Sequence, residues 1–246
     1  MKVINNIAYC EENHERQKLD IYVPNADTFP VFVFFHGGGI VNGSKDGFVQ
    51  FGKTLANQGI CTVCANYRLY PSASYPEFIL DAASAVAWVK KNISQYGKCT
   101  GIYVGGSSAG AYLSMMLAFD NKYLEAHKMS PMDISGFIHD AGQPTAHFNV
   151  LKERGIDSRR VIIDESAPLF HIGTHEVLPP MLFLVATDDM KNRLEQTHLV
   201  MSTLRHFGFE GDDWEERVIE GTHVNYANTN QAEIIANYIQ ERQKGL

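Results

Sequence analysis

The chain has 246 residues, of which 45% are hydrophobic and 20% are charged; this balance is typical of a globular protein and too apolar for a disordered one. Its 21 Lys and Arg residues against 28 Asp and Glu residues give a formal net charge of −7, which makes sequence-independent nucleic-acid binding improbable. The longest apolar run near the N-terminus covers residues 31–35, far short of the roughly 20 residues that span a bilayer. Because no secretory signal precedes it, we expect a cytoplasmic protein with no membrane span.

The four cysteines are too sparse for a disulfide scaffold, which supports the same expectation. Cys61 and Cys64 form a C-x-x-C within an apolar segment that is typical of a buried strand. Residues three apart on a strand point to opposite faces, so this pair is poorly placed to share a metal ion or to form a disulfide. We therefore interpret both as small apolar core residues.

The first half of the chain opens with two strands that no helix separates, and strands then alternate with helices. The clearest helix covers residues 76–95, where apolar side chains recur three and four positions apart. In chain order the predicted elements are strands over 2–9, 17–23 and 31–36, a helix over 48–57, a strand over 60–67, a helix over 76–95, a strand over 102–106 and a helix over 109–119.

The second half continues the alternation around one long irregular stretch. The predicted elements are strands over 134–139 and 181–187, a helix over 190–207, a strand over 214–219 and a helix over 229–243. Residues 141–178 form a long irregular stretch. Because irregular stretches of that length are usually functional, we interpret these residues as a partial cover over the site. An acidic stretch made of Asp212, Asp213, Glu215 and Glu216 is interpreted as a solvated edge before the last strand.

This order of elements predicts an α/β fold. About eight strands linked by helical crossovers form a mostly parallel sheet with helices on both faces. The first two strands form an antiparallel edge because no crossover lies between them. We expect one domain over residues 1–246, in which the stretch over 141–178 is a short cap-like insertion.

Residues 106–110 read Gly-Ser-Ser-Ala-Gly, a G-x-S-x-G motif between a predicted strand and a predicted helix. A sharp strand-to-helix turn forces its middle residue into an uncommon backbone conformation, and the glycines on either side keep Cβ atoms out of the turn. We therefore predict that Ser108, and not Ser107, is a nucleophile. Ala109 is the first residue of the predicted helix, so its N–H can donate to an oxyanion.

A glycine-rich turn, His36-Gly37-Gly38-Gly39, follows the predicted strand over 31–36. Glycines allow the backbone to approach a ligand and to present N–H groups to it, as the stabilisation of a developing oxyanion requires. We predict that Gly38 and Gly39 donate to the oxyanion together with Ala109. Neither a GxxxxGK[ST] nor a GxGxxG phosphate-binding motif is present. His36 is expected to order the loop rather than to act as a base.

A nucleophilic serine needs a histidine base and a carboxylate that orients the base. In a sheet of this kind the order along the chain is serine, acid and histidine, with the last two on loops after later strands. Asp188 and Asp189 follow the predicted strand over 181–187, and His223 follows the predicted strand over 214–219. We predict Asp189 and His223 for these roles, while Asp188 stays open as the acid and either aspartate can cap the helix that follows.

The combination of three segments resembles a known family. His36-Gly37-Gly38-Gly39, then residues 66–71 (Asn-Tyr-Arg-Leu-Tyr-Pro), then residues 105–110 (Gly-Gly-Ser-Ser-Ala-Gly) are similar to the α/β-hydrolase carboxylesterases of the hormone-sensitive-lipase-like and acetyl- and feruloyl-esterase-like groups. Pro76 with Asp81 and Trp88 stands where these families carry a Pro-x-x-x-x-Asp helix. The resemblance covers roughly residues 17–242 and implies an α/β-hydrolase fold and serine esterase activity on Ser108.

Two positions depart from the family pattern. The acid of these families follows a G-x-x-D turn, and here Ala186 replaces the glycine while the acid falls on Asp189. Ile40 stands where many members carry Phe or Trp, which bears on the shape of the acyl pocket. With the HGGG turn beginning at residue 36, we expect no N-terminal cap, and an open site of this kind suits short acyl groups on soluble esters.

Three alternatives stay open beside the esterase. The first is an arylformamidase resembling kynurenine formamidases, which share both glycine motifs and would act on a formamide. The second is a peptidase related to the prolyl oligopeptidases, disfavoured because no propeller-like domain is seen. The third is a non-catalytic binding protein on the same fold. No metal ion or organic cofactor is implied, the expected partner is a small-molecule ester or formamide, and the resemblance leaves a homodimer open.

Overall fold

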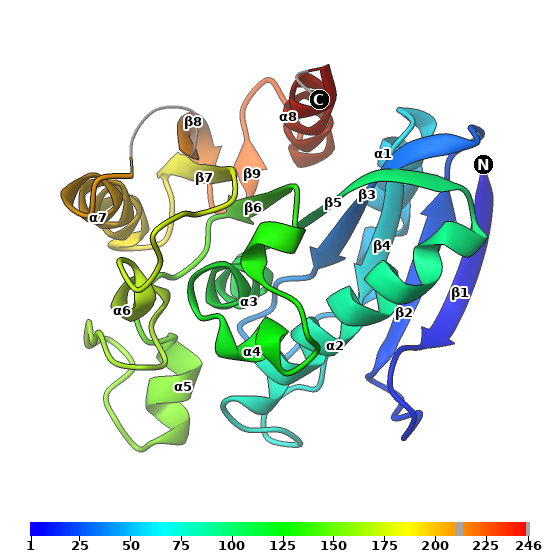
Figure 1. Ribbon diagram of the computed structural model, residues 1–246. Helices are drawn as coiled ribbons and strands as arrows, with labels where there is room; N and C mark the ends of the chain where they lie inside the picture. The colour runs from blue at the N-terminus through cyan, green and yellow to red at the C-terminus, as the bar shows by residue number, and fades with distance from the viewer. Residues whose placement is uncertain (210–213, 245–246) are drawn as a thin grey trace.

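The computed structural model describes residues 1–209 and 214–244 of the chain. Across these residues nine strands form one mixed sheet, in the order β1-β2-β4-β3-β5-β6-β7-β8-β9 (Figure 1). In chain order the strands are β1 (Lys2–Ala8), β2 (Lys18–Val23), β3 (Thr28–Phe35), β4 (Cys61–Ala65), β5 (Lys98–Ser107), β6 (Gly136–Asp140), β7 (Met181–Asp188), β8 (Trp214–Thr222) and β9 (Asn225–Tyr226).

The helices differ widely in length, and in the described part of the chain none is both long and apolar enough to cross a membrane. The α-helices are α1 (Val49–Asn57), α2 (Glu77–Asn92), α3 (Ala109–Phe119), α4 (Lys122–Glu125), α5 (Phe148–Glu153), α6 (Pro168–His171), α7 (Arg193–His206) and α8 (Gln231–Lys244). Short 3₁₀ helices are η1 (Lys45–Phe48), η2 (Ile93–Gln95) and η3 (Pro131–Asp133).

The strands from β4 to β8 in the sheet order pair in parallel, whereas β1, β2 and β9 join the sheet in antiparallel pairs. Carboxyl ends of parallel strands meet at the same edge of a sheet. Ser107, Asp140 and Asp188 end β5, β6 and β7, so this edge collects polar side chains. It is the edge at which the candidate site lies.

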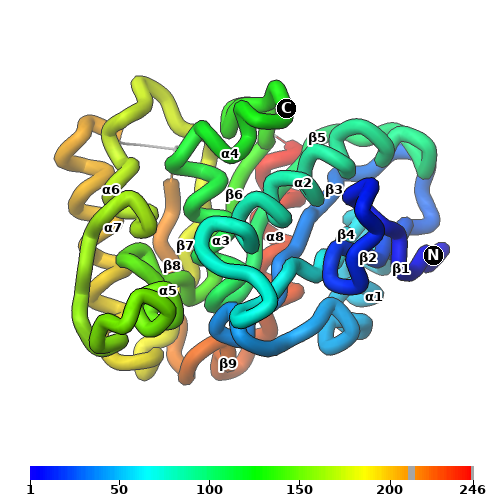
Figure 2. Tube along the Cα trace, turned by 90° about the horizontal axis from the view of Figure 1, so that it is seen from below, coloured from blue at the N-terminus to red at the C-terminus, as the bar shows by residue number. Residues whose placement is uncertain are grey.

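Apolar side chains cover both faces of the central strands. On β3, Val31, Val33 and Phe35 belong to the core shared with α2, α3 and α7, while Phe32 and Phe34 face the core shared with α1 and α8. This two-sided burial explains the continuous apolar run in the sequence. Helices α5, α6 and α7 lie together at the end of the molecule opposite β1, as Figure 1 and Figure 2 both show.

The structure confirms the predicted fold class: a mostly parallel sheet with helices on both faces. The first two strands form the predicted antiparallel edge, and α3 begins and ends where the sequence predicted. Cys61 and Cys64 are buried free thiols that face the two opposite cores, as the strand geometry required.

Three expectations need correction. The sheet has nine strands rather than about eight, because a two-residue strand, β9, folds back on the end of β8. Helix α7 begins at Arg193 and not at residue 190, since Asn192 adopts a left-handed conformation with φ of 66°. Residues 141–178 are not wholly irregular, because they contain α5 and α6, which are too short to show a helical period. Asp212 and Asp213 of the acidic stretch lie outside the described residues.

Candidate active site

Ser108 occupies a sharp turn between the end of β5 and the start of α3. Its backbone has φ of 54° and ψ of −113°, a strained conformation for a residue with a Cβ atom. The close approach of neighbouring backbone enforces the turn: a Cβ atom on Gly110 would lie 1.9 Å from the carbonyl oxygen of Phe35. The Ser108 N–H donates to the carbonyl of Asp140 at 2.7 Å. The hydroxyl of Ser108 is thus presented at the carboxyl edge of the sheet.

His223 reaches this hydroxyl from the turn between β8 and β9. Its Nε2 lies 2.9 Å from Ser108 Oγ, and its Nδ1 lies 2.6 Å from Asp189 Oδ1. The structure therefore brings together the serine, histidine and aspartate that the sequence singled out. Asp188, the alternative acid, is exposed at the end of β7, and neither aspartate caps α7, whose N-cap is Asn192.

The environment of Asp189 favours an ionised carboxylate. Burial raises the pKa of Asp189, but the hydrogen bond from His223 and those from the N–H groups of Met190 and Ala186 outweigh burial, so the pKa lies below its usual range. A carboxylate only accepts hydrogen bonds, so it selects the tautomer in which His223 Nδ1 carries the proton. His223 Nε2 is then left to accept the proton of the Ser108 hydroxyl.

The HGGG turn lies beside Ser108, with Gly38 and Gly39 in backbone conformations of positive φ (114° and 64°). A Cβ atom on Gly38 would lie 2.2 Å from the carbonyl oxygen of Asn42, so the turn requires glycine there. Within the described residues, the N–H groups of Gly38, Gly39 and Ala109 donate to no protein acceptor. These are the three N–H groups that the sequence proposed as oxyanion donors.

Polar contacts from Arg16 and His36 hold this turn in place. His36 Nδ1–H donates to the Gly37 carbonyl at 2.7 Å, and Arg16 Nη2 donates to His36 Nε2 at 3.2 Å and to the Gly43 carbonyl at 3.0 Å. The imidazole stacks on the ring of Tyr67, with centroids 4.5 Å apart. Burial lowers the pKa of His36 to about 4, so the ring is neutral at physiological pH. His36 therefore orders the turn, as the sequence analysis expected.

Ser108 lines a cavity of about 630 Å³ with a largely apolar wall. Phe148 and Asn149 of α5 line it, and the side-chain amide of Asn149 donates to the Gly39 carbonyl. The stretch over 141–178 thus contacts the HGGG turn directly. Ile40, which departs from the family pattern, is buried in the core and is not part of the cavity wall. The other lining residues are Gly37, Gly38, Gly39, Val41, Asn42, Gly43, Phe48, Ser107, Ser108, Met190, His223, Val224 and Gln231.

A buried carboxyl group that was not predicted from the sequence, Asp140, lies beneath the turn at Ser108. Asp140 ends β6 and accepts hydrogen bonds from the Ser107 hydroxyl at 3.1 Å, the Tyr226 hydroxyl and the Gln231 side-chain amide. Burial raises its pKa to about 6, although these hydrogen bonds act in the opposite direction. A polar residue at the carboxyl end of a buried strand was the available indication.

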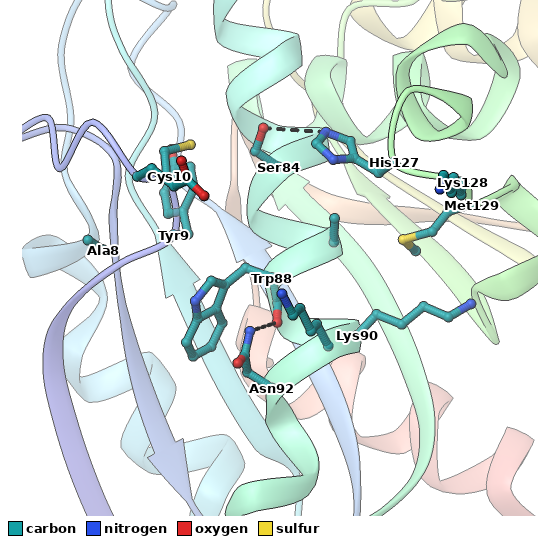
Figure 3. Close-up of a pocket in the computed structure, with 13 residues that line it drawn as sticks. Ala8, Tyr9, Cys10, Ser84, Trp88, Lys90, Asn92, His127, Lys128 and Met129 are labelled. Atoms are coloured by element: carbon teal, nitrogen blue, oxygen red, sulfur yellow. Dashed lines mark hydrogen bonds between the residues drawn. The ribbon is translucent and has the colours of Figure 1, made fainter.

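A second, larger hollow of about 830 Å³ lies beside α2, where Ser84 Oγ and His127 Nε2 are 3.4 Å apart (Figure 3). The Ser84 hydroxyl donates to the carbonyl of Leu80, and no carboxylate in the described residues orients His127. This pair therefore lacks the arrangement found at Ser108. The described residues also contain no group of three or more His, Cys, Asp or Glu side chains that could hold a metal ion.

Several known proteins resemble the chain in sequence. The BD-FAE family model matches residues 19–136. A probable isoprenylcysteine alpha-carbonyl methylesterase (ICMEL1) from Oryza sativa subsp. japonica is 34% identical over 116 residues, which cover 46% of this chain and 27% of the relative. Esterase LipC from Mycobacterium tuberculosis is 28% identical over 197 residues, which cover 72% and 48%. The kynurenine formamidase of Salmo salar is 30% identical over 116 residues, covering 46% and 37%. The chain thus spans about a quarter of the length of the plant methylesterases that it matches.

Solved structures match the chain over nearly its whole length. A truncated carbohydrate esterase from gut microbiota has a TM-score of 0.82 at 15% identity and covers 99% of this chain and 97% of its own. Esterase Est2 of Thermogutta terrifontis has a TM-score of 0.73 at 24% identity and covers 96% and 89%. The chain therefore has the α/β-hydrolase fold, matches the BD-FAE family model over residues 19–136, and has esterases among the proteins that it resembles in sequence.

Proposed function

We propose that the chain is a serine carboxylesterase that hydrolyses short-chain acyl esters through an acyl-enzyme on Ser108. The observation that carries this proposal is the unbroken hydrogen-bonded series from Ser108 through His223 to Asp189. A serine hydroxyl becomes a competent nucleophile when a base of this kind is oriented by a carboxylate. The esterases among the relatives of the chain support the same class of reaction.

In the proposed mechanism, Ser108 Oγ attacks the ester carbonyl while His223 Nε2 takes the hydroxyl proton. The same nitrogen then gives this proton to the leaving alcohol, and the acyl group stays on Ser108. A water molecule deprotonated by His223 attacks the acyl-enzyme and releases the acid. Asp189 holds His223 in the reactive tautomer and stabilises the imidazolium that forms in each half-reaction.

The tetrahedral intermediate in each half-reaction carries negative charge on the former carbonyl oxygen. We assign the N–H groups of Gly38, Gly39 and Ala109 to this oxyanion, because all three lie at the serine and lack a protein acceptor in the described residues. Such preorganised donors are strongest where water is excluded, and removal of one costs about 3 kcal/mol of transition-state stabilisation.

We also propose one domain over residues 1–246, in which residues 141–178 act as a small cap over the site. Support comes from Phe148 and Asn149, which line the cavity from this stretch. A cavity of about 630 Å³ with a short cap suits small acyl groups better than long lipid chains. Cytoplasmic localisation and homodimer formation, both considered from the sequence, stay predictions.

An arylformamidase is the second candidate, favoured by the likeness to the kynurenine formamidase of Salmo salar. The same triad and oxyanion donors would serve attack on a formamide carbonyl, since both reactions are acyl transfers. A non-catalytic binding protein is the weaker reading, because a binding function does not need a hydrogen-bonded triad.

The test compares the wild type with Ser108→Ala on p-nitrophenyl acetate, butyrate and octanoate, and then on N-formyl-kynurenine against phenyl acetate. We expect wild-type hydrolysis that is fastest on the short esters and that Ser108→Ala abolishes. Activity that survives the substitution would contradict the role of Ser108. Rates that rise steadily up to a palmitoyl ester would contradict the short-chain preference, and a much faster reaction with the formamide would favour the second candidate.

A further inference from the structure

Arg193, at the start of α7, is a buried cation whose guanidinium has no ion-pair partner among the described residues. The residue is 4% exposed, and its Nε and Nη1 atoms are buried without a hydrogen-bond partner. Within the described residues, its guanidinium makes no ion pair. A buried charge that lacks a partner destabilises the fold, so folded proteins usually neutralise it or use it in binding. Arg193 thus places a positive charge in the interior with no directly bonded counter-ion among the described residues.

Arg193 lines a cavity of about 320 Å³ whose wall is rich in positive charge. Arg159, Arg160 and Lys191 also line it, and of these only Arg159 is paired, with Asp157 at 2.6 Å, among the described residues. The first turn of α7 forms part of the same wall, where the helix N-terminus adds a favourable potential for anions. The described wall contains no carboxylate that would cancel this charge.

The cationic cavity adjoins the cavity of the proposed esterase site. Phe148 and Met190 line both cavities, so their side chains form the partition between the two. Met190 directly follows the triad aspartate, and Arg193 lies three residues further along the chain. A substrate with its ester carbonyl at Ser108 would have to extend past the side chains of Phe148 and Met190 to reach Arg193.

We propose that the ester substrate carries a carboxylate group, and that Arg193 binds this carboxylate in the cationic cavity while Ser108 attacks the ester. The proposal rests on the proposed esterase function and names its substrate class. Guanidinium groups bind carboxylates with charge-assisted hydrogen bonds that are stronger than those between neutral groups. Binding of the carboxylate supplies the ion-pair partner that Arg193 lacks among the described residues.

A different role for Arg193 makes a different prediction. The charge of Asp189 acts on the Arg193 guanidinium, so the guanidinium could serve only to stabilise the triad acid. In that case substitution of Arg193 would slow the hydrolysis of neutral and anionic esters by the same factor. A carboxylate-binding role instead changes the ratio between them, which is the quantity to measure.

Two pairs of probes measure this ratio on either side of the scissile bond. Mono-p-nitrophenyl adipate carries a free carboxylate on the acyl side, and methyl p-nitrophenyl adipate is its neutral counterpart. Free p-acetoxybenzoate, compared with its methyl ester, places one on the leaving-group side. For the wild type we expect kcat/KM to favour the carboxylate form in one of these pairs, and Arg193→Gln to reduce that preference by about 10- to 100-fold.

Controls separate this effect from a loss of net charge or of folding. Arg205→Gln removes the same charge from the last turn of the same helix, over Trp214, and should leave the ratio unchanged. Arg193→Lys should retain part of the preference. If Arg193→Gln fails to fold, the double variant Arg160→Gln/Lys191→Gln, at two exposed positions of the same wall, should lower the ratio as well.

A wild-type ratio near one in both pairs would overturn the proposal, as would a preference that survives in Arg193→Gln or an equal loss on both members of a pair. Calorimetric titration of Ser108→Ala with the same probes measures the preference without turnover. A different result is that the wild type hydrolyses no ester while Ser108→Ala binds the carboxylate probe more tightly than its neutral counterpart, a difference that Arg193→Gln removes. In that case the esterase function fails and the carboxylate site stands.

Discussion

His223 Nδ1 lies 2.6 Å from Asp189 Oδ1, whereas Asp188, the preceding residue, is exposed at the end of β7. The two aspartates therefore differ in whether they can orient the imidazole. We predict that Asp189→Asn lowers kcat by about 10⁴-fold, because an amide in this place favours the wrong tautomer of the histidine. Asp188→Asn is the matched control and should keep kcat within a few fold. Comparable losses in both variants on p-nitrophenyl acetate would contradict the assignment.

The close approach of Gly38 to Asn42 supports a second prediction. A Cβ atom on Gly38 would lie 2.2 Å from the Asn42 carbonyl oxygen, and the φ of 114° at Gly38 is unfavourable for any other residue. We expect Gly38→Ala to displace the HGGG turn and to lower kcat by about 10²- to 10³-fold, the cost of a lost oxyanion donor. Gly47→Ala, where a Cβ atom meets nothing within 4 Å, is the control. Unchanged kcat in Gly38→Ala would show that the turn does not serve the oxyanion.

The HGGG turn also depends on Arg16, which donates to His36 and to the Gly43 carbonyl. Loss of this side chain should loosen the turn without touching the triad. We predict that Arg16→Ala lowers kcat/KM about tenfold, the equivalent of about 1.4 kcal/mol. Arg16→Lys keeps the charge but not the forked geometry, so it should restore little of the activity. Full activity of Arg16→Ala would mean that His36 and Tyr67 hold the turn alone.

Asp140 gives a prediction about pH and stability. Its pKa of about 6 lies above the ordinary value of 3.8, so between these two pH values the folded protein holds a proton that the unfolded chain has released. The contribution of Asp140 to stability is therefore greatest below pH 4 and falls as the pH rises to about 6, by about 3 kcal/mol in total.

The measurement for Asp140 is the free energy of unfolding in urea at pH 4 and pH 7 for the wild type and for Asp140→Asn, which cannot titrate. The wild type should lose stability relative to the variant as the pH rises. Asp188→Asn, at an exposed position, controls for changes in the unfolded chain. A difference between wild type and Asp140→Asn that is the same at both pH values would refute the raised pKa.

Features that depend on residues close together in the sequence could be predicted from it, whereas features that depend on the packing of distant segments could not. The buried strands and α3 depend on local apolar runs and on the glycines around Ser108, so their patterns were readable. Strand β9, at two residues, and helix α6, at four, are too short for any period to reveal them. The start of α7 was missed for a different reason, since the left-handed conformation of Asn192 fixes it and leaves no mark on the apolar pattern.

The site residues divide in the same way. Ser108 and His223 stand in motifs or in fixed places after strands, so the fold order alone indicated them. Arg193 and Asp140 carry no motif, and their significance comes from burial that only the packing of distant segments creates. Tyr226 and Gln231, for example, reach Asp140 from 86 and 91 residues further along the chain.

Covalent labelling tests the central claim, that Ser108 is the nucleophile, most directly. The wild type, Ser108→Ala and Ser107→Ala are each treated with a p-nitrophenyl alkylphosphonate, and the modified residue is located by peptide mass spectrometry. We predict one phosphonyl adduct on Ser108 in the wild type and in Ser107→Ala, together with loss of esterase activity, and no adduct in Ser108→Ala. An adduct on another residue, or labelling that persists in Ser108→Ala, would contradict the account.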